Sequence, residues 1–399
     1  MQPDQSTVGQ QKPLQHRGSS RSISSSCSES PSEAFTTTSP VLALDKVTKN
    51  TEIADLLMEV TTKVKQRLLN VHQIREVSNK LSDLLNKSHI QSINDIERHG
   101  ESGKSTSLSA DVKLQIYICL TELISNYLIP RVINEAESFS NITKDDQSWN
   151  DYESKPIQST LRTILRERCD HWIHQLQAEN PPEIKAAILT LISCWFKAKE
   201  QFHHAHDHEI IWHESKSCLT NLNHLVKVKA LKVLGHGITS ISSLDRSLAP
   251  DILTLVGQYT RSQDPRVRNA AFHALHQIHK QDYKLDVMLY KDFCKALEDD
   301  YEGVRQVALH LVYIMSCAYP EHLIKLAGNS INKQINKGEL TREVRLIDDA
   351  FGKICNGVND VSVQVREKAM TLIGLFAENT ISSSRGNGVS QIFLDPDTR

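Results

Sequence analysis

The chain has 399 residues, of which 39% are hydrophobic and 24% charged, and its 46 basic and 48 acidic side chains leave a formal net charge of −2. This balance suits a folded protein and excludes the large single-sign field that general nucleic-acid or membrane binding would use. A chain of this length exceeds the size at which one core usually stops growing, which predicts several domains or a repeat array.

The N-terminal segment, residues 1–45, is rich in glutamine, proline and serine, with ten serines between Ser19 and Ser39. It contains too little apolar surface to offset its ordering entropy, so we expect a disordered tail. We also expect no secretory signal, because the first 30 residues lack an apolar core. No uninterrupted apolar run of about 18 residues occurs, so no membrane-spanning helix is expected.

From about residue 50 the apolar residues follow the three-and-four spacing of a helical face, as in Ile53, Leu57, Val60 and Val64. The sequence shows no sustained alternation and no Asn-Gly hairpin between apolar runs, so strand signals are nearly absent. The sequence therefore predicts an all-α protein. Between the helices we expect polar loops near 87–110 and 137–157, an insertion around 327–341, and loose chain after Thr380.

One motif recurs along the chain: an apolar residue, a basic residue, and then small or apolar residues four and eight positions after the first. Positions four and eight apart lie on one stripe of a helix, so each copy presents the same face to its neighbours. A small residue at the second place lets two helices approach closely. The clear copies are Val226, Lys227, Ala230 and Leu234; Val267, Arg268, Ala271 and Leu275; Val304, Arg305, Ala308 and Val312; and Val365, Arg366, Ala369 and Ile373.

The spacing of the copies indicates the fold. Weaker copies start at Val112 and Ile184, and from Ile184 onward the steps are 42, 41 and 37 residues, then 61 across the insertion. The step of 72 residues from Val112 to Ile184 predicts a missing or degenerate copy. Steps of about 40 residues are typical of HEAT and armadillo repeats, so we predict an α-solenoid. Its expected parts are the disordered tail 1–45, divergent repeats in 46–225, clear HEAT-type repeats in 226–380, and a loose tail in 381–399.

Acidic turns precede three of these helices, at Asp264-Pro265, Asp299-Asp300 and Asn359-Asp360. An acidic side chain there can cap the helix and accept hydrogen bonds from nearby basic residues. The basic row of Arg268, Arg305 and Arg366 could bind phosphate, but its regular place favours a ladder of hydrogen bonds between repeats.

Two glycine motifs resemble nucleotide-binding loops only superficially. Gly100 to Thr106 looks like part of a phosphate loop, but Arg98 stands where the pattern needs its first glycine, and the preceding segment is short and polar. Gly235-His236-Gly237 is interpreted as a helix stop after Leu234. The sequence contains no catalytic constellation, so we predict a non-catalytic protein without a cofactor.

A metal site is also not predicted. The histidine-rich run comprises His203, His204, His206, His208 and His213 with Asp207. A structural zinc site needs four committed ligands, and no cysteine stands at a standard spacing, so a solvated helix end is the better interpretation. The eight cysteines form no C-x-x-C pair, which favours reduced thiols in an intracellular compartment.

Four segments carry a resemblance to a known family: Ser262 to Ala271 (SQDPRVRNAA), Leu297 to Glu302 (LEDDYE), Tyr319-Pro320-Glu321, and Arg345 to Cys355 (RLIDDAFGKIC). With these segments, residues 226–375 resemble Integrator complex subunit 4. The last two segments have little reason to match in an unrelated HEAT protein. Members of that family are much longer, and the resemblance ends near Ala377.

The resemblance implies a nuclear protein of the Integrator complex, which processes small nuclear RNA 3′ ends and terminates promoter-proximal transcription. It implies a scaffold that holds the endonuclease, subunit 11, and its inactive relative, subunit 9. Nuclease chemistry and zinc then belong to those partners, and contact with RNA is indirect at most. The alternatives are a HEAT transport adaptor of the importin kind or another HEAT scaffold, with the cytoplasm as the alternative location.

Overall fold

The computed structural model describes residues 50–70, 72–81, 83–84, 108–129, 155, 157–167, 169–178, 180–200, 202, 204–243, 245–327 and 341–384. The predicted tail 1–45, the segment Gly100 to Thr106, His203 and most of the two predicted polar loops lie outside these residues.

The described residues are helical almost throughout, which confirms the prediction of an all-α, HEAT/armadillo-type solenoid. The helices are α2 (Asn50–Lys65), α4 (Ala110–Leu123), α6 (Cys169–Gln177), α7 (Pro182–Lys197), α8 (Ala205–Cys218), α9 (His224–Ile241), α10 (Leu248–Tyr259), α11 (Pro265–His279), α12 (Tyr290–Ala296), α13 (Glu302–Ala318), α14 (Leu346–Asn356) and α15 (Val363–Ser384). A π-helical turn, Ile124–Leu128, extends α4, short 3-10 turns occupy Val287–Leu289 and Gly357–Asn359, and 72–81 and 157–167 are also largely helical. Among the described helices, we find none with the length and hydrophobicity that crossing a bilayer would need.

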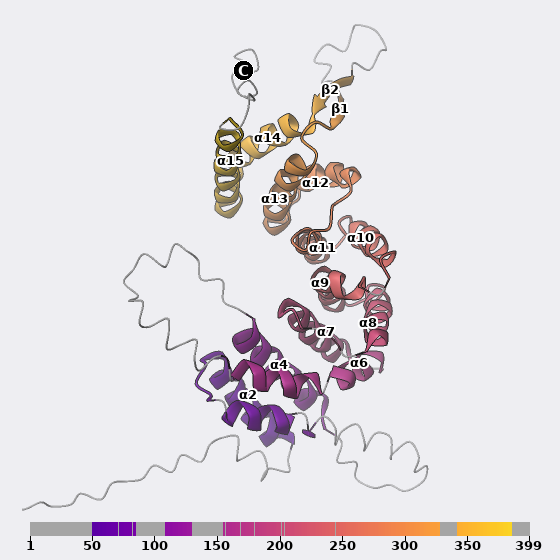
Figure 1. Cartoon of the computed structure of the whole chain (residues 1–399), viewed down its shortest axis with the longest axis vertical. Coiled ribbons are helices and arrows are strands. Elements are labelled where there is room, and N and C mark those ends of the chain that lie inside the picture. The colour runs from indigo at the N-terminus through magenta and orange to yellow at the C-terminus, as the bar shows by residue number, and fades with distance from the viewer. Residues whose placement is uncertain are drawn as a thin grey trace, which may run out of the picture. The chain divides into compact units, whose positions relative to one another are not determined.

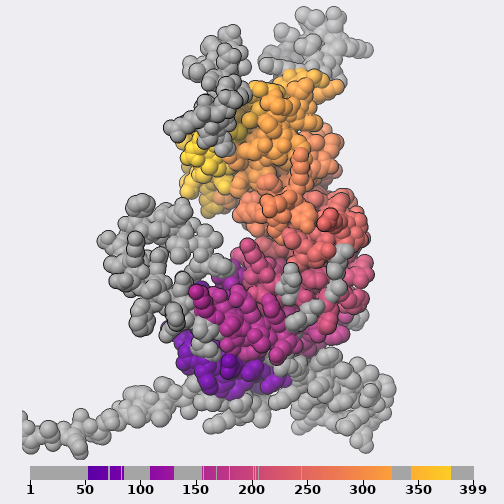
Figure 2. Space-filling view, viewed as in Figure 1, coloured from indigo at the N-terminus to yellow at the C-terminus, as the bar shows by residue number. Residues whose placement is uncertain are grey.

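The helices from α6 onward form pairs in two layers. The first helix of each pair (α6, α8, α10, α12 or α14, the A helices) packs against the second (α7, α9, α11, α13 or α15, the B helices). The B helices also pack against one another in chain order, α7 on α9, α9 on α11, α11 on α13 and α13 on α15 (Figure 1). In the space-filling view the colours of successive pairs follow one another without mixing (Figure 2). Each pair therefore contacts its neighbours in sequence, as in a solenoid.

The first two copies of the motif, 72 residues apart, lie on helices that contact each other. Helix α4, which contains Val112, packs directly against α7, which contains Ile184. Among the described residues, no further B helix lies between them.

Helix α11 shows why the motif folds as it does. Asp264 caps its first turn, with Oδ1 accepting a hydrogen bond from the backbone N–H of Arg266 at 2.9 Å. Pro265 occupies the first turn, where a missing N–H costs nothing. Val267 and Leu275, at 1% and 0% exposed, lie on the buried stripe of the helix. Local capping and the apolar stripe therefore specify the same helix.

The prediction that Gly235-His236-Gly237 stops a helix was wrong, because α9 continues to Ile241. Both glycines lie where neighbouring atoms approach closely. A Cβ on Gly235 would stand 2.8 Å from the Cα of Ala274 in α11, and a Cβ on Gly237 would stand 2.5 Å from the Phe196 ring of α7. The glycines allow α9 to pack tightly between its two neighbours.

The insertion around 327–341 begins and ends in two strands that the sequence did not reveal. β1 (Leu323–Ala327) pairs antiparallel with β2 (Thr341–Arg345), with Leu323 opposite Arg345 and Ala327 opposite Thr341. Each strand has only five residues, and the connecting segment is far longer than the short loops that identify a hairpin. The hairpin leads into α14, whose Leu346 N–H donates to the carbonyl of His322 at 2.8 Å.

The last described helix is longer than expected. α15 runs to Ser384, whereas we expected loose chain from residue 381. The first glycine after Thr380 is Gly386, so no helix-breaking residue stands between them. Residues 385–399 lie outside the described part of the chain.

Candidate interaction surfaces

The predicted repeat positions fall on the B helices and are occupied by core side chains. Exposure is at most 1% for the apolar and small members of the four copies, Val226, Ala230, Leu234, Val267, Ala271, Leu275, Val304, Ala308, Val312, Val365 and Ala369. Ile373 is half-buried and packs against the same core. These residues build the joints between helices and present no group to a ligand.

The basic row forms bonds between repeats. Arg268 of α11 donates from Nε and Nη2 to the two carboxylate oxygens of Asp299 at 2.7 and 2.9 Å. Its Nη1 donates to the carbonyls of Ser262 and Gln263 in its own repeat. Each guanidinium of this kind ties the turn of one repeat to the turn of the next, in the bidentate geometry that favours arginine.

Arg305 repeats the arrangement one repeat later. Its Nε and Nη2 donate to Asp360, both at 2.8 Å, and its Nη1 donates to the carbonyls of Asp299 and Asp300 at 2.8 and 3.1 Å. Arg305 and Asp360 are only 10% and 13% exposed at their side chains. Each of the two arginines thus makes four hydrogen bonds within the solenoid, which favours a structural role over phosphate binding.

The two ends of the row differ from its middle. Arg366 donates from Nη1 to the carbonyls of Asp360 and Val361, but no carboxylate of the described residues accepts a hydrogen bond from it. At the other end, Asp264 pairs with Arg266 of its own helix and forms no ion pair with Lys227 within the described chain. The ladder therefore has two complete rungs and an open one at Arg366.

The ladder shifts the acidity of its carboxylates. Hydrogen bonds from Arg305 lower the pKa of Asp360 against the opposing effect of burial, and the backbone N–H of Ser362 lowers it further. Burial acts to raise the pKa of Asp299, yet hydrogen bonds from Arg268 and from the Tyr301 N–H bring it below its usual range. Both carboxylates are therefore held ionised by the arginines that they join.

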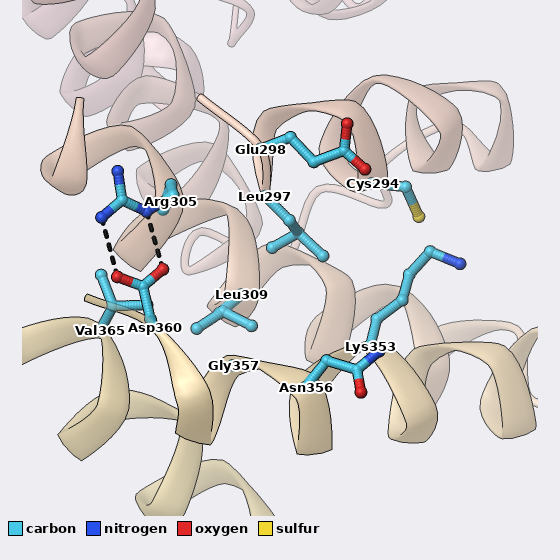
Figure 3. A pocket seen from close by; sticks show the side chains of 10 residues that line it. All are labelled: Cys294, Leu297, Glu298, Arg305, Leu309, Lys353, Asn356, Gly357, Asp360 and Val365. Carbon is cyan, nitrogen blue, oxygen red and sulfur yellow. Dashed lines mark hydrogen bonds and ion pairs between the residues drawn. The ribbon is translucent and has the colours of Figure 1, made fainter. Parts of the chain in front are cut away.

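A pocket lies at the joint between the α12–α13 and α14–α15 pairs (Figure 3). Its volume is about 210 Å³, and its lining includes the Arg305–Asp360 ion pair and the Cys294 thiol. Burial raises the pKa of Cys294 to about 11, so this thiol is protonated at neutral pH and is a poor nucleophile. Lys353, also in the lining, is bonded to Asp349. Within this lining, the Arg305–Asp360 pair is the contact that joins the two repeats.

The histidine-rich run is divided among different environments. The N–H of His204 donates to Asp207 Oδ2 at 3.1 Å and so helps to cap α8. His208 is buried between Phe196 and Phe202, with ring centroids 6.3 and 5.9 Å away, and burial lowers its pKa. His206 and His213 both approach Glu209. Within the described residues no group of three or more potential ligands is arranged to hold a metal ion.

The C-terminal B helix exposes a position that is covered in every earlier copy. The residue five places after the first apolar residue of the motif is Leu231, Phe272 or Leu309 in α9, α11 and α13, and these are 0%, 1% and 2% exposed. The corresponding Met370 of α15 is 61% exposed, and Val363 of the same helix is 66% exposed. A following repeat covers the earlier positions, whereas no described residue covers this end of the row. The sequence alone did not single out Met370 because its type fits a core position equally well.

Comparisons with known proteins identify a related family. No family model matches the chain. Human Integrator complex subunit 4 is 38% identical over 164 residues, which are 39% of this chain and 16% of the human protein. The Xenopus laevis protein of the same name is 34% identical over 216 residues, 51% of this chain and 20% of that protein. The resemblance inferred from residues 226–375 is therefore confirmed, while the matched part is at most a fifth of these relatives.

Among solved structures, a crystal structure of an archaeal HEAT-like repeats protein from Thermococcus onnurineus NA1 has a TM-score of 0.39 and 15% sequence identity. The comparison covers 83% of this chain and 97% of that one.

Proposed function

We propose that this chain is a non-catalytic scaffold of an Integrator complex. The observation that carries the proposal is the 38% identity to human Integrator complex subunit 4 over 164 residues. By that resemblance its partners are the endonuclease, subunit 11, and its inactive relative, subunit 9, and its location is the nucleus. It acts without a cofactor, and the cleavage chemistry belongs to the nuclease.

The fold supports a role in holding other proteins. Stacked helical pairs offer a long surface without a central cavity, which is how solenoid proteins bind large partners. The ionised groups that the repeats bring together, such as Arg268 with Asp299 and Arg305 with Asp360, are bonded to each other. These groups therefore maintain the shape of the scaffold.

The open end at α15 is the surface that we propose for docking. Val363 and Met370 expose apolar surface beside Arg366, which lacks a carboxylate partner among the described residues. Exposed apolar side chains that lie together indicate a contact surface. A helical partner that begins with an acidic turn would fit this surface. In the earlier repeats, the acidic turn of the following repeat pairs with Arg268 or Arg305 in the same way.

The test is affinity purification of the full tagged chain from nuclear extract, followed by mass spectrometry. Recovery of subunits 9 and 11 together is the expected result. The double variant Val363→Glu/Met370→Glu should lower their recovery, whereas Met288→Glu, at a residue 76% exposed on the other layer, should not. Recovery of transport factors without Integrator subunits would overturn the proposal and favour an importin-like adaptor.

A further inference from the structure

Charge is unequally distributed between the two helix layers. Helices α9 and α11 contain no acidic residue, and α7 and α13 contain one each, Glu183 and Glu302, both in the first turn, whereas α15 contains Glu367 and Glu378. The acidic residues of the ladder stand in the turns, where arginines neutralise them. On α9 and α11 the basic side chains therefore meet no carboxylate from their own helices.

Six basic residues form what we call the cationic face: Lys232 of α9, His273 and His276 of α11, Lys280 at the end of α11, His310 of α13 and Lys368 of α15. Lys232, His273 and His310 each stand six residues after the first apolar residue of their motif copy, so they occupy one position in successive repeats. The rings of His276 and His310 have their centroids 4.4 Å apart across the α11–α13 joint. The face thus continues from helix to helix along four B helices that pack side by side (Figure 1).

At neutral pH the charge of this face belongs to Lys232, Lys280 and Lys368, and these lysines oppose protonation of its histidines. Burial lowers the pKa of His276 to about 3, and His310, Lys280, His273 and Lys368 lower it further. Burial also lowers the pKa of His310 to about 4, with further lowering by Lys368, Lys280 and His279.

The pKa values of two other members are lowered in the same way. Burial lowers the pKa of His273, and Lys232 and Lys280 lower it further. Burial and the nearby Lys280 lower the pKa of Lys368. Within the described chain, no ion pair joins any of the three lysines to a carboxylate. An anion placed here would relieve repulsion that the isolated chain leaves unbalanced.

We propose that the cationic face binds an acidic segment of a polypeptide, with its carboxylates paired to Lys232, Lys280 and Lys368 and hydrogen-bonded to His276 and His310. The proposal extends the scaffold function by naming the chemistry of one partner. It uses a surface separate from the open end at Val363 and Met370.

The face suits a peptide better than a nucleic acid. Proteins that bind single strands combine positive charge with aromatic rings on which bases stack. Apart from the histidine rings, the face offers no such platform, because none of the large apolar side chains exposed on α7, α9, α11, α13 or α15 is aromatic. Packed helices lie about 8–10 Å apart, and an extended chain advances about 3.3 Å per residue, so roughly every third residue would meet a new helix. A glutamate-rich segment of about ten residues would span the face.

The test measures binding of fluorescein-labelled decaglutamate to the full chain by fluorescence anisotropy at low ionic strength. The double variant Lys232→Gln/Lys280→Gln should weaken binding about fivefold or more, because two exposed charge pairs are lost. The matched control Lys291→Gln/Lys295→Gln removes the same charge from exposed positions of α12 and should leave affinity within about twofold. Equal losses in the two variants, or no binding of the peptide, would overturn the proposal. Tighter binding of labelled decauridylate would do so as well, in favour of RNA.

The histidines provide a second readout. With pKa values of about 3 and 4, the rings of His276 and His310 are neutral at pH 7, and each can donate one N–H hydrogen bond to a peptide carboxylate. His276→Ala/His310→Ala should therefore weaken binding at pH 7 by about twofold or more, while the dependence on Lys232 and Lys280 remains. An unchanged affinity in a folded double variant would show that these histidines do not contact the peptide. Failure here leaves the scaffold proposal standing, because that proposal is judged by recovery of Integrator subunits.

Discussion

Arg305 and Asp360 are 55 residues apart in the chain and are joined by two hydrogen bonds of 2.8 Å, from Nε to Oδ2 and from Nη2 to Oδ1. Arg305 lies in the first turn of α13, and Asp360 lies just before α15, so the pair crosses the joint between two repeats and closes the loop that contains the 327–341 insertion. Because both side chains are largely shielded from water, removing one partner leaves a charge with neither its ion pair nor full hydration.

Replacing Arg305 by glutamine should therefore destabilise the protein by about 2–3 kcal/mol, the range for losing hydrogen bonds to a buried charge. The matched control is Arg266→Gln, which removes an arginine that is 57% exposed and bonded only to Asp264 two residues away. It should leave stability nearly unchanged, because the pair is exposed to solvent. Urea unfolding followed by circular dichroism measures both. Equal losses of stability in the two variants would show that the Arg305–Asp360 pair stabilises the protein no more than an exposed ion pair does.

The ladder also predicts a particular sensitivity to acid. The folded pKa of Asp360 lies below its unfolded value of about 3.9, so its stabilising effect is complete above that value and is lost as the pH falls through the folded pKa. Asp360→Asn should be clearly less stable than the unmodified protein at pH 6, and the difference should shrink by pH 3. Unfolding midpoints at the two pH values test this. A difference that stays constant would mean that Asp360 titrates alike in both states.

The motif at 226, 267, 304 and 365 predicted the helices, their buried stripe and the ladder, because periodicity and charge are local properties of the sequence. The features that the sequence did not predict depend on contacts between segments that are distant in the chain. Gly235 is a helix stop by local preference, but in the fold it is the point where Ala274 of the next repeat approaches. The β1–β2 hairpin joins strands of five residues each across a long segment, so no turn signal marked it.

The candidate surfaces were harder to predict from the sequence. The cationic face joins residues from four helices, and only the packing of those helices shows that His276 and His310 lie together. Likewise, Met370 is unusual only by comparison with Leu309, which occupies the same place one repeat earlier. Both features become visible when repeats are compared in three dimensions.

The covered and uncovered positions should respond differently to truncation. Leu309→Ala leaves a cavity against the following repeat and should cost about 2–5 kcal/mol. Met370→Ala removes a side chain that is 61% exposed and should cost about 0.5 kcal/mol or less. Denaturant unfolding of the two variants tests the comparison. A large cost at Met370 would show that this end of the solenoid is covered in solution.

The strongest test of the repeat arrangement uses one substitution at two equivalent glycines. Gly235 stands nine residues after Val226, and Gly374 stands nine residues after Val365. A Cβ on Gly235 would meet the Cα of Ala274 at 2.8 Å, whereas a Cβ on Gly374 would meet nothing within 4 Å.

The same change to alanine should therefore act in opposite directions. Gly235→Ala forces α9 and α11 apart and should cost about 1–3 kcal/mol, whereas Gly374→Ala improves helix propensity and should stabilise by up to about 1 kcal/mol. Native-state hydrogen exchange would locate each effect, because repeats that contact only their neighbours should loosen locally. In Gly235→Ala, protection should fall in α9 and α11 and persist in α15. A uniform loss of protection through α15 would show that the chain unfolds as one cooperative unit, and destabilisation by Gly374→Ala would show that another element occupies the open end.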